Sequence, residues 1–259
     1  ESLSLGACYA VEAEARGSVT PLVNAYLGDD ADGWSYDWTE LVARAGADHQ
    51  DFDLWEGVGV EEAARLLAHD CIVARCVDRA EFGARALGNR SILANPSNPK
   101  NLKIINEAVK NRDFWMPFTP SIQEEHCDRY LKNPKRVSSP FMTIGFETRP
   151  EYRSEIIAAL HPADFSARPQ FVSQTINMDY WLLIEEFRKI SGIPALLNTS
   201  LNLHGDPMNY TVEDAIRTLA LSGLDFLLLP RNRLLYKTRA REVLVASIGL
   251  EPMAPPSDN

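Results

Sequence analysis

The chain has 259 residues, of which 45% are hydrophobic, and its formal net charge is −10 at pH 7. This length and apolar content can bury a sizeable core in one large domain, or in one domain with an appendage. No apolar run approaches the roughly eighteen residues of a transmembrane helix, and the N-terminal residues lack the basic-then-apolar order of a signal peptide. We therefore expect a cytoplasmic protein with no membrane partner.

The cysteines and histidines show no metal-binding pattern. Cys8, Cys71, Cys76 and Cys127 form no Cys-x-x-Cys pair and no cluster with the five histidines, which favours reduced thiols and predicts no metal site in this chain. A pI near 5.0 argues against nucleic acid as a partner, because affinity for phosphate backbones grows with the number of cationic contacts.

The N-terminal part of the chain is strongly acidic. Residues 1–70 hold 15 acidic and three basic side chains, and such runs are usually solvated faces or linkers. A helix is predicted over residues 3–15, almost at the first residue. Part of the segment should nevertheless pack against the body, because it contains four large aromatic residues: Trp34, Tyr36, Trp38 and Trp55.

From residue 60 onward, strand and helix patterns alternate without a strict βαβ rhythm. We predict helices over residues 61–69, from a cap at Asn98 or Asn101 onward, over 151–160, from 179 to a stop at Gly192 and Pro194, and from a capping box at Thr211 and Asp214 onward. Strands are predicted over residues 71–76, 91–94, 118–122 (an edge strand or irregular wall), 141–146, 171–176, 195–197, 225–229 and 233–237. The fold class is therefore α/β with α+β mixing, a twisted mixed sheet with packed helices. A loose tail is expected after residue 239.

Positive charge gathers in one stretch of this acidic chain. Residues 75–112 contain eight Lys and Arg against three acids. Gly83 and Gly88 bracket Arg85, and glycines allow the turns that a phosphate cradle needs. Arg85 and Arg90 would offer planar forks to phosphate oxygens, and Ser91 a hydroxyl. The alternative, that these are surface loop residues with carboxylate neighbours, stands beside the anion site with equal weight.

Two further cations follow the predicted helix that starts near residue 100. If that helix ran on through Arg112, Lys110 and Arg112 would point about 160° apart. If the chain becomes extended there, the two side chains lie on one side. We expect the extended form, because an anion site needs convergent charges.

Five motifs in chain order carry a resemblance to a known family. They are Glu81-Phe-Gly-Ala-Arg-Ala-Leu-Gly-Asn-Arg-Ser-Ile-Leu93, Asn106-Glu-Ala-Val-Lys-Asn-Arg112, Pro117-Phe-Thr-Pro-Ser121, His161 and Asp164 with Ala167-Arg-Pro-Gln170, and Leu197-Asn-Thr-Ser-Leu-Asn-Leu-His-Gly-Asp-Pro207. The region of about residues 60–238 resembles the C-terminal half of the O-carbamoyltransferases that decorate antibiotics and nodulation factors. It departs from the family's usual pattern at two places. The family commonly has Phe where this chain has Leu201, and Gly-Thr where this chain has Phe165-Ser166.

The resemblance implies an architecture. Residues 1–50 would be the end of an N-terminal domain similar to the tRNA-modification protein Kae, with an acidic linker. Residues 51–239 would be a domain similar to the YrdC and Sua fold, and 240–259 the tail. The rest of the Kae-like domain would be a partner, and the metal that it holds in relatives, Fe²⁺, has no ligands in this chain.

The resemblance also implies the chemistry. The domain would activate carbamoyl phosphate with ATP to carbamoyl adenylate, for transfer to a hydroxyl of a small-molecule acceptor, and Mg²⁺ would arrive with the nucleotide. The predicted catalytic residues, which neutralise the two anions, are Arg85, Lys110, Arg112 and Arg168. The predicted substrate- and nucleotide-binding residues are Arg90, Ser91, Gln170, Asn198, Ser200 and Asn202.

Plainer roles remain open for several of these residues. Arg90 would pair with Glu81, Arg168 with Asp164, Lys110 would favour a helix dipole, and Asn202 would cap a turn. For the domain as a whole, the alternatives are a nucleotide- or RNA-binding module without chemistry, or a domain that is inactive without its partner domain.

Overall fold

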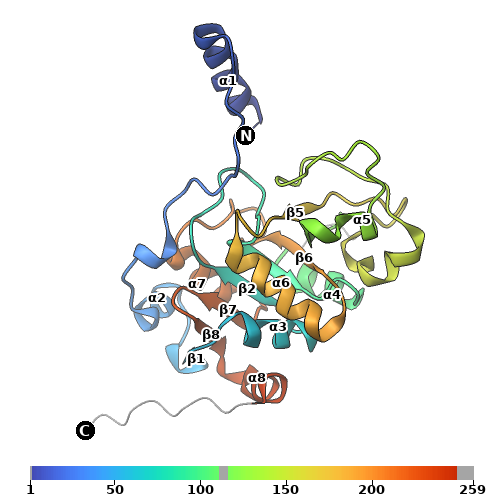
Figure 1. Ribbon diagram of the computed structural model, residues 1–259. Coiled ribbons are helices and arrows are strands. Elements are labelled where there is room, and N and C mark those ends of the chain that lie inside the picture. The colour runs from blue at the N-terminus through green and yellow to red at the C-terminus, as the bar shows by residue number, and fades with distance from the viewer. Residues whose placement is uncertain (1, 111–115, 250–259) are drawn as a thin grey trace.

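The computed structural model describes residues 2–110 and 116–249, and its centre is one eight-stranded sheet (Figure 1). The strands are β1 (Phe52–Glu56), β2 (Val73–Cys76), β3 (Arg90–Ala94), β4 (Thr119–Gln123), β5 (Gln170–Val172), β6 (Ala195–Ser200), β7 (Phe226–Leu229) and β8 (Arg233–Lys237). They lie in the order β1-β8-β7-β2-β3-β6-β4-β5. The β2–β7 and β4–β5 pairs are parallel and the other pairs antiparallel, so the predicted mixed α/β sheet is confirmed.

Helices pack on both faces of this sheet. The helices of the described chain are α1 (Ser2–Arg16), which lies apart from the sheet (Figure 1), α2 (Trp38–Arg44), α3 (Val60–Ala68), α4 (Lys100–Ile105), α5 (Cys127–Tyr130), α6 (Met178–Ser191), α7 (Val212–Leu221) and α8 (Arg241–Ile248). Among them are 3-10 turns at Ala31–Gly33, His49–Asp51, Glu124–His126, Pro150–Glu155, Ile157–Ala159 and Thr238–Ala240, and a π-helical turn at Asn106–Lys110.

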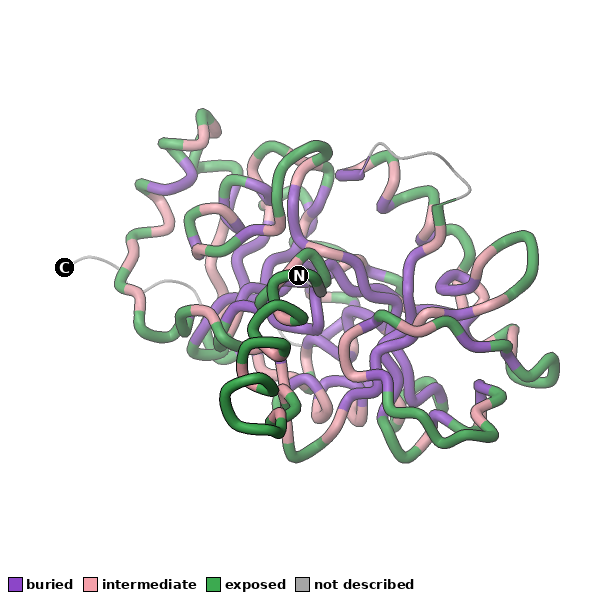
Figure 2. Tube along the Cα trace, turned by 90° about the horizontal axis from the view of Figure 1, so that it is seen from above, coloured by how far each residue is buried: buried purple, intermediate pink, exposed green. Residues whose placement is uncertain are grey.

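Two hydrophobic cores lie on the two sides of the sheet. One core packs α3, α6 and α8 against one face, and the other packs α2, α4 and α7 against the opposite face. Neighbouring strand residues alternate between them: Val73 joins the first core and Ala74 the second, as the two-residue period of a strand requires. Figure 2 shows the buried chain concentrated in this sheet.

The best-predicted helices are those with clear end signals. In α6, Asn177 accepts a hydrogen bond from the Tyr180 N–H at 3.0 Å, and Gly192 closes the helix with φ 78°. In α7, the Thr211 hydroxyl and the Asp214 carboxylate form the predicted capping box. Both helices therefore begin and end where side-chain and glycine chemistry dictates.

Three predicted elements are wrong. Strand β4 is not at the edge, because it lies between β6 and β5; β5 pairs only with Ser121–Gln123, so Pro120 stays outside that ladder. Residues 141–146 form no strand beyond a single bridge at Phe146, since Met142 has φ 54°. Residues 151–160 form two 3-10 turns instead of one helix, with Ile156 (φ −128°) between them.

The region after residue 239 also differs from the predicted loose tail. Residues 241–248 form α8, which packs against α3 and buries Leu244 and Ile248 in the first core. Residues 250–259 lie outside the described part of the chain. The acidic N-terminal region likewise contains elements that were not predicted, β1 and α2, which complete the sheet edge and the second core.

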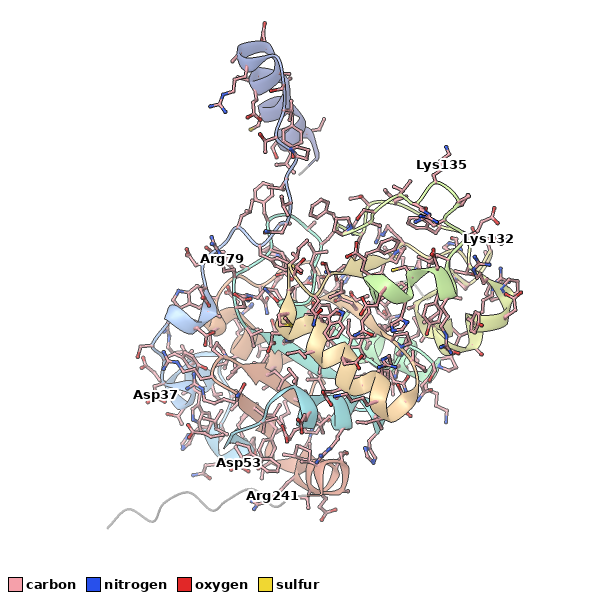
Figure 3. All side chains as sticks on the ribbon, in the orientation of Figure 1. Asp37, Asp53, Arg79, Lys132, Lys135 and Arg241 are labelled. Carbon is pink, nitrogen blue, oxygen red and sulfur yellow. The ribbon has the colours of Figure 1, made fainter. Side chains whose placement is uncertain are left out.

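The N-terminal helix α1 stands away from the body (Figure 1) and is largely exposed (Figure 2), with Leu3 89% accessible. The chain returns to the body as a strap, residues 24–31, which runs along residues 78–82. Backbone hydrogen bonds join the two segments: Phe82 N–H to Ala25 O at 2.7 Å, Gly28 N–H to Ala80 O at 2.9 Å, and Ala80 N–H to Asp29 O at 3.0 Å. Arg79, labelled in Figure 3, adds a bond to the Gly28 carbonyl at 2.9 Å.

Of the helices that the structure describes, none combines the length and apolar character needed to cross a bilayer.

Candidate functional site

The arginine loop, residues 81–90, connects the antiparallel strands β2 and β3. Gly83 and Gly88 have φ values of 108° and 117°, a region that favours glycine. A Cβ atom at Gly88 would come within 2.3 Å of the Tyr180 ring. The loop is thus packed directly against the start of α6, with no room for a side chain at that point.

The base of this loop is fixed by a buried carboxylate. Glu81 Oε1 accepts hydrogen bonds from the N–H groups of Leu87 (2.7 Å), Asn89 (2.8 Å) and Arg90 (3.2 Å). Ser91 contributes as well, because its hydroxyl accepts from the Gly88 N–H at 3.0 Å. These contacts close the loop on itself.

Arg90 is fully buried, and its Nε and Nη1 groups donate to backbone carbonyls, while Nη2 is buried without a hydrogen-bond partner among the described residues. Its guanidinium donates to Tyr210 O at 2.9 Å, Val77 O at 2.7 Å and Asp78 O at 3.2 Å. The pairing with Glu81 that the sequence allowed runs through the backbone N–H of Arg90. The predicted substrate contacts of Arg90 and Ser91 stay predictions, since the contacts present here are structural.

A second buried arginine, not singled out from the sequence, supports the same loop. Arg75 donates to Gly88 O at 2.5 Å and to Asn89 Oδ1 at 3.1 Å, and it forms an ion pair with Asp179. Its guanidinium also lies 5.6 Å from the centre of the Tyr180 ring. The contact joins β2 to the first turn of α6 across the loop.

At the tip of the loop the charges are arranged differently. Arg85 is exposed and lines a polar pocket together with half-buried Arg168 and with Asn198, Thr199 and Ser200 of β6. In the part of the chain that the structure describes, neither arginine forms an ion pair. Burial, and then the positive charge of Arg85, lower the pKa of Arg168. Two cations that share one pocket repel each other, and this arrangement favours the binding of an anion.

The alternative partner of Arg168 is engaged elsewhere. Asp164 lies 3.3 Å from His161 Nδ1 and accepts from the Ser166 N–H at 2.8 Å. The Arg168 Nε–H is buried without a hydrogen-bond partner among the described residues. This donor is therefore available to a ligand in the polar pocket.

A chain of polar side chains forms the back of this pocket. Asn198 donates from Nδ2 to Ala86 O at 3.1 Å and to Ser121 Oγ at 3.0 Å, and Ser121 donates to Gln170 Oε1 at 2.8 Å. Gln170 in turn donates to Leu87 O at 2.8 Å. The chain holds two successive carbonyls of the arginine loop, directly after Arg85.

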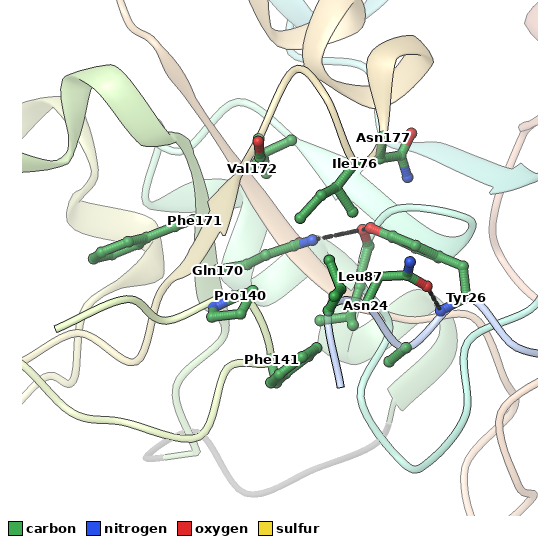
Figure 4. Close-up of a pocket in the computed structure, with 13 residues that line it drawn as sticks. Asn24, Tyr26, Leu87, Pro140, Phe141, Gln170, Phe171, Val172, Ile176 and Asn177 are labelled. Atoms are coloured by element: carbon green, nitrogen blue, oxygen red, sulfur yellow. Dashed lines mark hydrogen bonds between the residues drawn. The ribbon is translucent and has the colours of Figure 1, made fainter. Parts of the chain in front are cut away.

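The N-terminal strap joins the same chain. Tyr26 donates its hydroxyl hydrogen to Leu87 O at 2.8 Å and accepts from Gln170 Nε2 at 3.3 Å, the contact drawn in Figure 4. Ser121 and Tyr26 were not identified from the sequence. Ser121 stands at the end of a quoted motif, and the hydrogen-bond partner of Tyr26, Leu87, lies 61 positions away in the chain.

Lys110 is fully buried beneath Ser200. Its ammonium donates to Ser200 O at 2.5 Å and to Asn202 Oδ1 at 2.6 Å, and Ser200 Oγ also donates to Asn202 at 2.6 Å. Lys110 thus anchors the end of β6, where Ser200 enters the polar pocket. Arg112, and the predicted extended geometry beyond Lys110, lie outside the described residues.

Residues 2–110 and 116–249 contain no group of three or more His, Cys, Asp or Glu side chains placed to hold a metal ion.

The family model described as "Carbamoyltransferase C-terminus" matches residues 64–237. Among curated proteins, the chain is 41% identical over 165 residues to the uncharacterized protein MJ1058 of Methanocaldococcus jannaschii, which covers 64% of this chain and 27% of that protein. It is 39% identical over 187 residues to the nodulation protein NolNO of Sinorhizobium fredii, a match that covers 72% of this chain and 27% of that protein. It is 36% identical over 226 residues to the nodulation protein NolO of Bradyrhizobium diazoefficiens, a match that covers 86% of this chain and 40% of that protein.

The chain therefore spans well under half the length of these relatives. Among solved structures, full-length HypF in its phosphate- and nucleotide-bound form matches with a TM-score of 0.46 and 13% identity, over 81% of this chain and 29% of that one. A likeness this weak carries no argument about the site.

Proposed function

The chain belongs to the family of the carbamoyltransferase C-terminus, and we propose that its polar pocket activates carbamoyl phosphate with ATP to form carbamoyl adenylate. The carbamoyl group then passes to a hydroxyl of a small-molecule acceptor. The domain of residues 51–239 carries this half-reaction, with a fold of the YrdC type, in the cytoplasm.

One observation carries the proposal: Arg85 and Arg168 line the same pocket without a carboxylate partner in the described chain. Burial, and then the positive charge of Arg85, lower the pKa of Arg168, and an anion between the two guanidinium groups removes their mutual repulsion. Joining two anionic substrates requires this kind of charge neutralisation and alignment. Planar guanidinium forks suit phosphate and carboxylate oxygens better than an ammonium group does.

Asn198 supports a carbamoyl group as the other ligand. Its Nδ2 is engaged by Ala86 O and Ser121, while its Oδ1 is buried and has no hydrogen-bond partner among the described residues. An unpaired buried acceptor is costly, and a carbamoyl –NH₂ is a donor that would satisfy it. Asn198 is therefore an acceptor for the carbamoyl nitrogen.

The other predicted residues act around these three. Ser200 offers its hydroxyl to a phosphate oxygen, and Lys110 and Asn202 hold it in place. Arg90, Ser91 and Gln170 position the arginine loop. Arg112 remains a predicted fourth cation.

The proposed reaction balances without a redox step. Water cleaves carbamoyl phosphate to carbamate and phosphate, and a carbamate oxygen then attacks the α-phosphorus of ATP. The bond between the α and β phosphates breaks, and pyrophosphate leaves. Magnesium enters with the nucleotide, and no step is assigned to it.

The acceptor and the transfer step belong to a partner. The matched relatives extend far beyond the region shared with this chain. We assign acceptor binding, and the Fe²⁺ found in relatives, to a Kae-like N-terminal domain of which residues 1–50 are the end and linker.

The test is pyrophosphate release from Mg²⁺ and ATP, with and without carbamoyl phosphate, and mass spectrometry for carbamoyl-AMP. Release should depend on carbamoyl phosphate. Arg85→Ala should lower it at least a hundredfold, because removing one electrostatic stabiliser from a catalytic site has about that effect. Lys110→Ala should lower it as well, because Ser200 then loses the ammonium group that holds it in the pocket. The control is Arg241→Ala, an exposed arginine on α8 at the far end of the molecule from α1 (Figure 3), which should leave release unchanged.

Normal turnover in both site variants would overturn the assignment. If the intact chain binds ATP but releases no pyrophosphate, adding a separately expressed N-terminal domain separates the two remaining readings. Restored pyrophosphate release would identify a domain that needs its partner domain, and a continued lack of release would identify a binding module.

A further inference from the structure

A second hollow adjoins the polar pocket and has a different character. It is an apolar cleft of about 740 Å³ that lies between α1 with residues 21–25 on one side and residues 82–87 and 141–143 on the other. Its apolar side chains are those of Leu5, Tyr9, Leu22, Phe82, Phe141 and Met142. Hollows of this size hold ligands as large as a nucleotide.

The two hollows are continuous at the arginines. Ala84, Arg85, Met142 and Arg168 line both the cleft and the polar pocket. A ligand whose anionic end lies on the two guanidinium groups would therefore place its other end in the apolar cleft.

We propose that this cleft binds the purine base of the nucleotide, and that Phe82 is its stacking platform. This inference rests on the proposed function, which places the phosphates on Arg85 and Arg168. A base has an apolar face that stacks on aromatic rings. A polyhydroxylated acceptor would lose hydrogen bonds to water against this lining without replacing them, so the base is the occupant.

Phe82 is suited to this role by its position. Its ring is 44% exposed although phenylalanine is normally buried, and it stands three residues before Arg85 in the same loop. Its backbone N–H is fixed by the strap at Ala25 O, 2.7 Å away. The exposed ring is therefore held on a rigid backbone beside the anion site.

Calorimetric titrations of the whole chain with ATP, AMP and inorganic tripolyphosphate test the proposal. Phe82→Ala should weaken ATP and AMP binding between about fivefold and a hundredfold, the range for loss of one base–aromatic stack, and leave tripolyphosphate binding unchanged. Phe82→Tyr, which keeps the ring, should retain the affinity. Arg85→Ala should weaken ATP and tripolyphosphate together. Leu221→Ala, which removes an equally exposed apolar side chain from α7, is the control and should change nothing.

Equal ATP affinity in Phe82→Ala and the unmodified chain would overturn the base site, even if pyrophosphate release persists. A Phe82-dependent affinity in a protein that releases no pyrophosphate, with or without a separately expressed N-terminal domain, would support the base site and remove the proposed reaction. Binding of tripolyphosphate as tightly as ATP by the unmodified chain would also overturn the base site.

Discussion

The base and the tip of the arginine loop use the same side chain for opposite purposes. At the base, Arg90 is buried and donates to three carbonyls from two separate segments, and Arg75 holds the Gly88 carbonyl. At the tip, five residues before Arg90, Arg85 is exposed and faces another cation, Arg168, across the polar pocket.

The difference shows how to separate arginines that hold a fold from arginines that hold a ligand. A buried guanidinium is tolerated when most of its donors are bound to carbonyls, as those on Nε and Nη1 of Arg90 are, and it then fixes the backbone around it. Two guanidinium groups that share a pocket without a carboxylate have a cost that only an incoming anion removes. Charge density along the sequence is the same in both cases, so only the partners distinguish them.

The largest expected effect on stability comes from removing Arg90 at the base of the arginine loop. Arg90→Ala leaves the carbonyls of Tyr210, Val77 and Asp78 without their donor. We expect a loss of about 3–5 kcal/mol in the free energy of unfolding, measured by urea denaturation. Arg85→Ala should change the same quantity by less than about 0.5 kcal/mol while it abolishes pyrophosphate release. Equal stability losses in the two variants would remove the distinction between base and tip.

A smaller loss of stability is expected when the packing of the arginine loop against α6 is disturbed at Gly88. Gly88→Ala places a Cβ atom 2.3 Å from the Tyr180 ring at a backbone φ of 117°, so both overpacking and backbone strain oppose it. We expect destabilisation by about 2–4 kcal/mol, read from the denaturation midpoint. Gly205→Ala, which also has positive φ but has nothing within 4 Å of the added atom, isolates the strain. If both variants lose the same stability, the loop does not depend on contact with Tyr180.

The parts of the fold that could be predicted are those encoded locally. The Tyr180, Leu183 and Phe187 stripe with Gly192 defined α6, and Thr211 with its capping box defined α7. Strand order is set by contacts far apart in the chain, so a proline at residue 120 suggested an edge although β5 covers the strand beyond it. Helix α8 was missed because its apolar side chains gain their meaning only from α3, some 180 residues earlier.

The same limit applies to the site. Arg85, Arg168 and Asn198 were identified because glycine spacing and ordered motifs mark them, and the structure brings all three to one pocket. Arg75 reads as an ordinary strand residue, and Tyr26 lies outside the region that matches the family, residues 64–237. Their roles come from three-dimensional contacts with the arginine loop, which no local pattern announces.

The smallest expected effect tests whether the N-terminal strap reaches the tip. Tyr26→Phe removes the hydroxyl that donates to Leu87 O and accepts from Gln170, and burial, which raises the pKa of this phenol, keeps it a donor. We expect a loss of about 1 kcal/mol in stability and a rise of about threefold in KM for carbamoyl phosphate with kcat unchanged, because loosening Leu87 misplaces Arg85 in both ground and transition states. Tyr36→Phe is the matched control, since its buried hydroxyl has no hydrogen-bond partner in the described chain. A KM change shared by both variants, or absent from Tyr26→Phe, would show that the strap stabilises the loop without positioning its arginine.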